Sequence, residues 1–248
     1  MKQGFLIPVY RHGETACRIA KRLAAMDMPV IVVDDGNEAQ TAAMLACCAA
    51  NTVGVTLVRL EKNSGKGGAA IRGFEKAHEL GLTHVLLIDA DEQHDEGVIP
   101  FFLAESHKHP DMIVCGYPVF DETAPRSRVS GRKVSNFWAA AVTLSMELTD
   151  VLCGFRGYPV DASLRVTRHL LFDRRMGFDA EILVRLYWKK VYPLFYPIKV
   201  HYPADGISNF RMVRDNVRIS WMFSRLFVGM LLRLPLLIIR GIRRRKER

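Results

Sequence analysis

Four acidic residues lie close together directly after an apolar run. The stretch "HVLLIDADEQHD" carries Asp89, Asp91, Glu92 and Asp95 in its second half. Like charges this close repel one another, and a carboxylate at the edge of a core is costly unless a positive group meets it. Oxygen ligands suit Mg²⁺ or Mn²⁺. The Asp89-Ala-Asp91 spacing, in which alternate residues leave a strand tip, therefore predicts a site for one divalent ion.

Short runs rich in Val and Ile alternate with helix-forming stretches in the N-terminal half. The expected strands are "FLIPVY", "PVIVVDDG", "GVTLVRL", "HVLLIDAD" and "MIVCGYPV", and the expected helices are "ETACRIAKRLAAMD", "AQTAAMLACCAAN" and "AAIRGFEKAHELG", the last stopped by Gly81. Continuously hydrophobic strands are typical of parallel sheets buried on both faces. The pattern predicts an α/β fold with a doubly wound, mostly parallel sheet. Ligands bind such sheets at the carboxyl ends of the strands, where both Asp34-Asp35 and Asp89/Asp91 fall.

Two other nucleotide-binding patterns are disfavoured. The first strand-to-helix turn, "VYRHGET", lacks the GxGxxG of dinucleotide folds, and "KNSGKGGA" lacks GxxxxGK[ST]. Beyond residue 117 a polar loop leads into a helix on which Arg128, Arg132 and Asn136 are spaced by four and share one face. Spacing alone allows two interpretations of this row. A solvated helix face is the more common one, and a phosphate-binding row beside the acidic rim is the other.

The last ~30 residues combine long apolar runs with regularly placed arginines. At about 100° per residue, Arg218, Arg225, Arg233 and Arg240 share one side of a helix, and Leu, Ile, Phe, Met and Trp occupy the rest. A spanning helix needs about 20 apolar residues without central charges. We therefore expect residues 213–248 to lie in a membrane interface, basic side toward the headgroups and kinked at Pro235, after a catalytic domain of residues 1–212. The alternative is a helix packed on the core or in a dimer interface.

Charge and cysteine content suggest a location. The net charge of +9 is concentrated in the terminal "RGIRRRKER", which indicates an anionic membrane surface or a nucleic acid as partner. Few aromatic residues interleave with these bases, so no nucleic acid is expected. The five cysteines form no CxxC and are odd in number, and the apolar start is too short for a signal peptide. We expect a cytoplasmic protein, peripheral on the inner face of the cell membrane.

Six motifs in order resemble one known family. They are "IPVYRHGE", "VVDDGNEA", "NSGKGGAAIRGF", "LLIDADEQHD", "CGFRGYP" and "GFDAEILVR". Together, over about residues 3 to 210, they resemble family 2 glycosyltransferases of GT-A fold, most closely the branch of dolichyl-phosphate mannose synthases and related polyprenyl-phosphate glycosyltransferases.

On the donor side, the resemblance implies a nucleotide-sugar site bridged by Mg²⁺ or Mn²⁺. The implied nucleotide-binding residues are Pro8, Tyr10 and Glu14 at the border of the pocket, Asp34 and Asp35 at the base and ribose, and Lys66 nearby. The implied metal ligands are Asp89, Asp91 and Gln93. A metal there neutralises charge as the leaving group departs. His94 is expected at the surface or behind the ligands.

On the acceptor side, the sequence departs from the family pattern. Arg128 and Arg132 match the basic residues that such synthases use for a lipid phosphate. The resemblance therefore favours a phosphate-binding row over a solvated helix face. The family's Gly-x-Ser-Lys segment reads "DGISNF" here, with Asn209 where Lys is expected, and Arg211 is the candidate to supply the missing charge to the diphosphate.

The need for a general base depends on the acceptor. A lipid phosphate is already anionic, so positioning by arginines suffices. A hydroxyl acceptor needs a base, for which Asp179 and Glu181 are the candidates, and a helix N-terminal acid pair favoured by the dipole is an equal alternative. Arg156 and Tyr158 are expected to shape the sugar or acceptor pocket.

The sequence as a whole predicts an inverting, metal-dependent glycosyltransferase with a nucleotide-sugar donor and a lipid-linked acceptor. A sugar-phosphate nucleotidyltransferase is one alternative, although its Gly-rich N-terminal signature is missing. A non-enzymatic peripheral membrane protein that uses only its basic tail is another, and it predicts that Asp91→Ala is silent.

Overall fold

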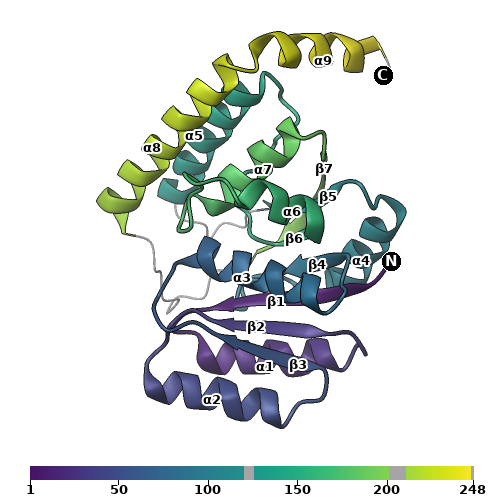
Figure 1. The fold of residues 1–248 in the computed structure, drawn as a ribbon, viewed down its shortest axis with the longest axis vertical. Helices are drawn as coiled ribbons and strands as arrows, with labels where there is room; N and C mark the ends of the chain where they lie inside the picture. The colour runs from purple at the N-terminus through teal and green to yellow at the C-terminus, as the bar shows by residue number, and fades with distance from the viewer. Residues whose placement is uncertain (120–125, 201–210, 247–248) are drawn as a thin grey trace.

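A seven-stranded sheet forms the centre of the molecule (Figure 1). The computed structural model describes residues 1–119, 126–200 and 211–246, with the side chains of 126–130 and 243–246 left aside. The strands are, in sheet order, β3 (Val55–Arg59), β2 (Val30–Asp34), β1 (Gln3–Val9), β4 (His84–Leu87), β6 (Arg156–Pro159), β5 (Ile113–Val119) and β7 (Pro193–Lys199). All neighbours are parallel except β6, which runs antiparallel to β4 and β5. The predicted doubly wound, mostly parallel sheet is confirmed.

Helices cover both faces of this sheet. Those described are α1 (Gly13–Ala24), α2 (Ala39–Ala50), α3 (Lys66–Glu79), α4 (Ile99–Lys108), α5 (Arg126–Thr143), α6 (Val160–Thr167), α7 (Phe178–Trp188), α8 (Met212–Leu231), α9 (Leu234–Lys246) and the short 3₁₀ helix η1 (Glu96–Val98). In Figure 1, α1 and α2 lie below the sheet, while α3, α6 and α7 lie above it with α5, α8 and α9 beyond them. The predicted stop of α3 is confirmed, because Gly81 has a left-handed φ of +69° that favours glycine.

Alternating side chains of the central strands feed two cores. On β1, Leu6 points into the core shared with α3 and α7, whereas Phe5 and Ile7 point into the core shared with α1 and α4. All three side chains are fully buried. Burial on both faces explains why these strands are continuously hydrophobic.

The C-terminal segment is a bent pair of helices. Helices α8 and α9 meet at 76°, and Pro235 lies in the first turn of α9, where its missing N–H is not needed. The predicted kink is therefore confirmed. No single helix in the described ranges is both long and apolar enough to cross a membrane, and the bent pair passes that test only when its two parts are taken together.

The predicted orientation of the arginine stripe is wrong. Arg225 lies 3.4 Å from Glu181 of α7, Arg233 stacks on the Trp188 ring, and Arg240 donates a 2.7 Å hydrogen bond to the Trp188 carbonyl. These arginines face the protein because α7 offers them a buried carboxylate, an aromatic face and a free helix-end carbonyl. The outward face is apolar instead, and its exposed members are Met212, Val213, Val217, Trp221, Phe227, Val228, Leu231, Leu232, Leu236, Ile238, Ile239 and Ile242.

Candidate active site

Lys66 joins two carboxylates that are far apart in the sequence. Its Nζ lies 2.8 Å from Asp89 Oδ1 and 2.8 Å from Asp179 Oδ2. Lys66 begins α3, Asp89 follows β4, and Asp179 lies in the first turn of α7. Burial acts to lower the pKa of Lys66, but Asp179 and Asp89 outweigh it and raise that pKa. Burial likewise acts to raise the pKa of Asp89, but the charge of Lys66 outweighs it and lowers that pKa, so Lys66 and Asp89 both stay charged.

Asp91, beside this cluster, has no counter-ion among the described residues. Among the described residues it forms no ion pair, and its Oδ1 accepts only the Gln93 N–H, at 3.2 Å. Burial raises the pKa of Asp91, and the adjacent negative charge of Asp89 raises it further. A cation placed here would relieve both effects.

The other acids of "DADEQHD" are satisfied within the protein. Glu92 pairs with Arg18 at 2.6 Å and with Arg22 at 2.8 Å, both on α1. Asp95 caps η1 by accepting the Gly97 N–H at 2.8 Å. The acidic stretch therefore divides, and only Asp89 and Asp91 face the candidate site.

His94 is in contact with the site rather than at the surface. Its Nε2 lies 3.9 Å from Asp89 Oδ2, and its ring packs edge-on against Phe155, with 5.4 Å between the centroids. His94 therefore lies behind Asp89, which is one of the two positions that the sequence predicted for it.

The Asp34-Asp35 pair is buried and internally bonded. The Asp35 carboxylate accepts hydrogen bonds from Ser64 N at 2.7 Å, Ser64 Oγ at 2.8 Å and Gly65 N at 2.9 Å. Asp34 Oδ1 accepts the Asn37 N–H at 2.9 Å. These bonds tie the end of β2 to the Gly-rich loop that delivers Lys66. Contact of Asp34 and Asp35 with a base or ribose stays a prediction.

The remaining predicted nucleotide residues lie along the same rim. Pro8 pairs with Val33 near the end of β1, Tyr10 follows that strand, and Glu14 is exposed in the first turn of α1. Thr15, beside Glu14, donates a 2.6 Å hydrogen bond to the Ala90 carbonyl. That bond fastens α1 to the Asp89-Ala-Asp91 turn.

Glu181 does not belong to this site. Its carboxylate is fully buried, 2.6 Å from Arg185 and 3.4 Å from Arg225, and it also accepts the Asp173 N–H at 2.8 Å. A general base must reach the proton that it removes. The expectation of a general base at Glu181 is therefore corrected, and Asp179 alone of the two acids reaches the site.

The predicted phosphate row has a different use where it is described. Arg132 forms an ion pair with the buried Asp150, and Asn136 donates to the Thr149 carbonyl at 2.7 Å. These contacts hold the segment that leads to β6, so Arg132 and Asn136 form neither a solvated helix face nor a row that is free to bind phosphate. The Arg128 side chain and Asn209 lie outside the described residues.

Arg211 keeps its predicted role only as an expectation. Its backbone N–H donates to Asp215 Oδ2 at 2.7 Å, at the start of α8, and its side chain is exposed.

The "CGFRGYP" stretch supports the site from behind. A Cβ on Gly154 would lie 2.3 Å from both Asp89 Oδ2 and Lys66 Nζ, so any larger residue there would displace these two groups. Arg156 and Tyr158 are fully buried, and Arg156 Nη1 donates to the Asp179 carbonyl at 2.5 Å. Since neither side chain is accessible, the expectation that they shape the sugar pocket is corrected to positioning of α7.

Sequence reasoning missed one further support. Arg175 Nη1 donates to Asn63 Oδ1 at 3.0 Å, which braces the loop before Lys66. Its only sequence signal was the basic pair Arg174-Arg175, which precedes "MGFDAEI".

The oxygen atoms near Asp89 and Asp91 suit a metal ion that takes only some of its ligands from the protein. In the ranges that the structure describes, no group of three or more His, Cys, Asp and Glu side chains is arranged to hold a metal ion. Asp89 and Asp91 offer carboxylate oxygens, and Gln93 an amide oxygen. Mg²⁺ is commonly bound through one or two carboxylates together with substrate phosphates and water.

Comparison with known proteins agrees with this geometry. Residues 5–167 match the family model described as glycosyl transferase family 2. The undecaprenyl-phosphate mannosyltransferase of Micrococcus luteus is 26% identical over 194 residues, 73% of this chain and 75% of that protein. The UDP-N-acetylglucosamine–dolichyl-phosphate N-acetylglucosaminyltransferase of Methanococcus voltae is 24% identical over 243 residues, 92% of this chain and 96% of that protein.

A solved structure shares the fold. Glucosyl-3-phosphoglycerate synthase from Mycobacterium tuberculosis, in complex with Mn²⁺, UDP and glucosyl-3-phosphoglycerate, has a TM-score of 0.62 at 15% identity, over 93% of this chain and 78% of that chain. The nucleotidyltransferase and non-enzymatic alternatives have no support in these matches. The chain belongs to glycosyl transferase family 2 and is a nucleotide-sugar-dependent glycosyltransferase of GT-A fold.

Proposed function

We propose that this glycosyltransferase is metal-dependent and inverting, and that it moves a sugar from a nucleoside diphosphate to a polyprenyl phosphate at a membrane surface. The observation that carries the proposal is the cluster in which Lys66 holds Asp89 and Asp179 together beside the unpaired Asp91.

Asp91 and Asp89, with Gln93 as a further oxygen donor, would hold Mg²⁺ or Mn²⁺. When bound, the metal neutralises charge on the diphosphate leaving group. Lys66 keeps Asp89 ionised and fixes its position, which leaves Asp91 as the carboxylate available to a cation. The internally bonded Asp35 holds the loop from which Lys66 projects.

A phosphate acceptor is favoured over a hydroxyl acceptor. Asp179, the only predicted base that reaches the site, is already held by Lys66 at 2.8 Å, so its carboxylate has a partner other than an acceptor hydroxyl. A lipid phosphate is anionic already and needs no base. Two relatives carry undecaprenyl phosphate and dolichyl phosphate in their names, which supports the same acceptor class here.

Membrane docking would use the outward apolar face of α8 and α9. Leu232 is 79% exposed and Trp221 is 66% exposed, within a row that continues to Ile242. Exposed patches of this kind are typical of interaction sites. The proposed location is peripheral, on the inner face of the cell membrane, with the active site held near lipid-linked acceptors.

A thermal-shift screen tests the donor site. The purified protein is heated with UDP, GDP, CDP or dTDP, each with Mn²⁺, Mg²⁺ or EDTA. At ~100 times its dissociation constant, a nucleotide should stabilise the folded state by about 2.7 kcal/mol. We expect one nucleotide to act only with metal. Asp91→Ala should abolish the shift, whereas Asp95→Ala, which alters a neighbouring acid outside the site, should retain it. A metal-independent shift, or one that survives in Asp91→Ala, would refute the metal site.

A further inference from the structure

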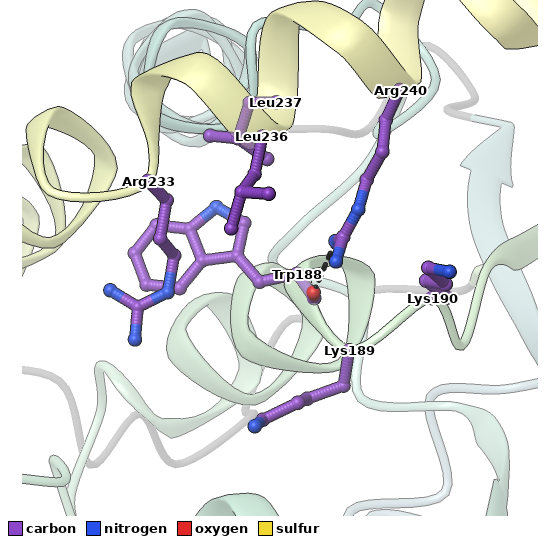
Figure 2. A pocket seen from close by; sticks show the side chains of 7 residues that line it. All are labelled: Trp188, Lys189, Lys190, Arg233, Leu236, Leu237 and Arg240. Carbon is purple, nitrogen blue, oxygen red and sulfur yellow. Dashed lines mark hydrogen bonds between the residues drawn. The ribbon is translucent and has the colours of Figure 1, made fainter.

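A pocket lies between the C-terminal end of α7 and the helix α9 (Figure 2). Its volume is about 250 Å³, below the roughly 300–1,000 Å³ of pockets for drug-sized ligands. Its lining residues are Trp188, Lys189, Lys190, Arg233, Leu236, Leu237 and Arg240. The space suits a small group rather than a nucleotide-sugar.

Positive charge in this pocket is uncompensated. Four of the seven lining residues are cationic, none is acidic, and none of the four forms an ion pair with any residue that the structure describes. Arg240 donates to the Trp188 carbonyl at 2.7 Å, and Arg233 lies 4.8 Å from the Trp188 ring centroid. A helix C-terminus carries about half a negative charge. One cation satisfies the end of α7, so the charge that remains favours an anion.

The pocket is continuous with the outward apolar face. Leu236 lines the pocket and is 56% exposed, and Ile239, one turn further along α9, is 49% exposed. In Figure 2, Arg240 reaches down from α9 and Arg233 from the turn before it, on either side of the Trp188 ring, while the lysines project from the end of α7. A small basic recess beside an exposed apolar row matches the two halves of an anionic lipid, its phosphate and its acyl chains.

The pocket is distinct from the candidate active site. Asp179 begins α7 and Trp188 ends it, so nine residues, or about 14 Å along the helix axis, separate the two. We propose that this pocket binds the phosphate-bearing headgroup of an anionic membrane lipid and that this lipid is an anchor rather than the acceptor. The assignment rests on the proposed docking of α8 and α9 at a membrane.

Vesicle sedimentation tests the assignment. The full chain is mixed with vesicles of phosphatidylcholine, with and without phosphatidylglycerol, at constant ionic strength. We expect tighter binding to the anionic vesicles. Lys189→Gln/Lys190→Gln should weaken that binding by about tenfold or more, because the pocket loses two of the four cations that would contact the phosphate. Both lysines are exposed, so the variant should fold, and circular dichroism checks this.

A matched variant separates a pocket from diffuse attraction. Arg214→Gln/Arg218→Gln removes the same charge from α8, outside the pocket, and should retain most of the anionic preference. Equal losses in the two variants would overturn the assignment. Binding to both vesicle types without preference would overturn the pocket and leave the proposed docking intact, whereas binding to neither would overturn both. The thermal shift caused by a nucleotide is measured without lipid, so it tests the transferase site independently of membrane binding.

Free inorganic phosphate could occupy the same pocket in place of a lipid headgroup, because it carries the same anionic oxygens. Inorganic phosphate, compared with chloride at equal ionic strength, should not stabilise the protein in a thermal shift. Stabilisation by phosphate that Lys189→Gln/Lys190→Gln removes, with unchanged vesicle binding, would assign the pocket to a soluble anion and overturn the lipid.

Discussion

At the scale of residues, the molecule itself answers the repulsion among the acids of "DADEQHD". Lys66 neutralises Asp89, and two arginines of α1 neutralise Glu92. Asp91 is the acid of this stretch that has neither an ion pair nor a helix-capping role among the described residues. A cluster that reads as one metal site in the sequence is therefore two structural ion pairs, a helix cap and one open carboxylate.

Gly154 provides a test of this arrangement. Gly154→Ala should displace Lys66 and Asp89, because the new Cβ would lie 2.3 Å from both side chains. We expect unfolding free energy to fall by about 1–3 kcal/mol, the usual cost of overpacking, and nucleotide affinity to drop at least tenfold. Urea denaturation and nucleotide titration measure these quantities.

Gly131→Ala is the matched control, since a Cβ on this exposed helical glycine of α5 meets nothing within 4 Å. It should add up to about 1 kcal/mol of stability and leave nucleotide binding unchanged. Equal nucleotide affinity in the two variants would show that Gly154 does not hold the site.

His84 predicts a pH dependence of stability. Burial lowers the pKa of His84, whose Nε2–H donates to the Pro110 carbonyl at 2.8 Å. A lowered folded-state pKa means that its contribution is complete above the unfolded value of about 6.5 and is lost as the pH falls toward the folded value. The slope from this residue is at most about 1.4 kcal/mol per pH unit.

Urea denaturation between pH 7.5 and roughly pH 5 measures that slope. His84→Gln should flatten it, and His107→Gln, at an exposed position, should leave it unchanged. An identical slope in the parent and in His84→Gln would contradict the prediction.

At the scale of elements, α7 connects the active site to the C-terminal helices. Its first turn carries both Asp179 at the site and Glu181, which lies 3.4 Å from Arg225 of α8. The carbonyl of its last residue, Trp188, accepts a hydrogen bond from Arg240 of α9. A shift of α8 would therefore act on the helix that positions Asp179.

Glu181→Gln separates a structural role from a catalytic one. Removing one partner of a buried ion pair costs about 3–5 kcal/mol, and two arginines would lose their counter-charge. We expect a stability loss of this size, with nucleotide affinity of the folded protein retained. Glu79→Gln, which breaks an exposed pair with Lys76, should leave the stability nearly unchanged. Lost activity without lost stability would restore the general-base role of Glu181.

At the scale of the whole molecule, α8 and α9 run along one edge of the structure (Figure 1), and they carry the exposed apolar face. Leu232→Gln/Ile239→Gln should weaken binding to phosphatidylcholine vesicles at least tenfold, because the face loses two exposed anchors. Val53→Gln, at a 97% exposed position beyond α2, should bind as the parent does. Stability should change little in either case. Unaltered vesicle binding by the double variant would argue against docking through this face.

Short sequence patterns were sufficient to predict much of the fold and the strand ends at which the site lies. Five strands, the stop of α3 at Gly81 and the kink at Pro235 follow from burial, backbone freedom and a missing N–H, which are properties of single residues and short runs. The position of Asp89 and Asp91 at a strand end follows from the same pattern. Strand β6 was not recognisable, because "RGYP" lacks an apolar run and is held by strands on both sides.

Only the tertiary structure decided which partners these residues meet. Helical periodicity determines that Arg225, Arg233 and Arg240 share a face, but whether that face meets lipid or protein depends on Glu181 and Trp188, which come from α7. Likewise, no spacing predicts that Lys66 bridges Asp89 and Asp179. Such pairings depend on long-range packing of the chain, which places charges from distant segments within 3 Å and changes the role of each.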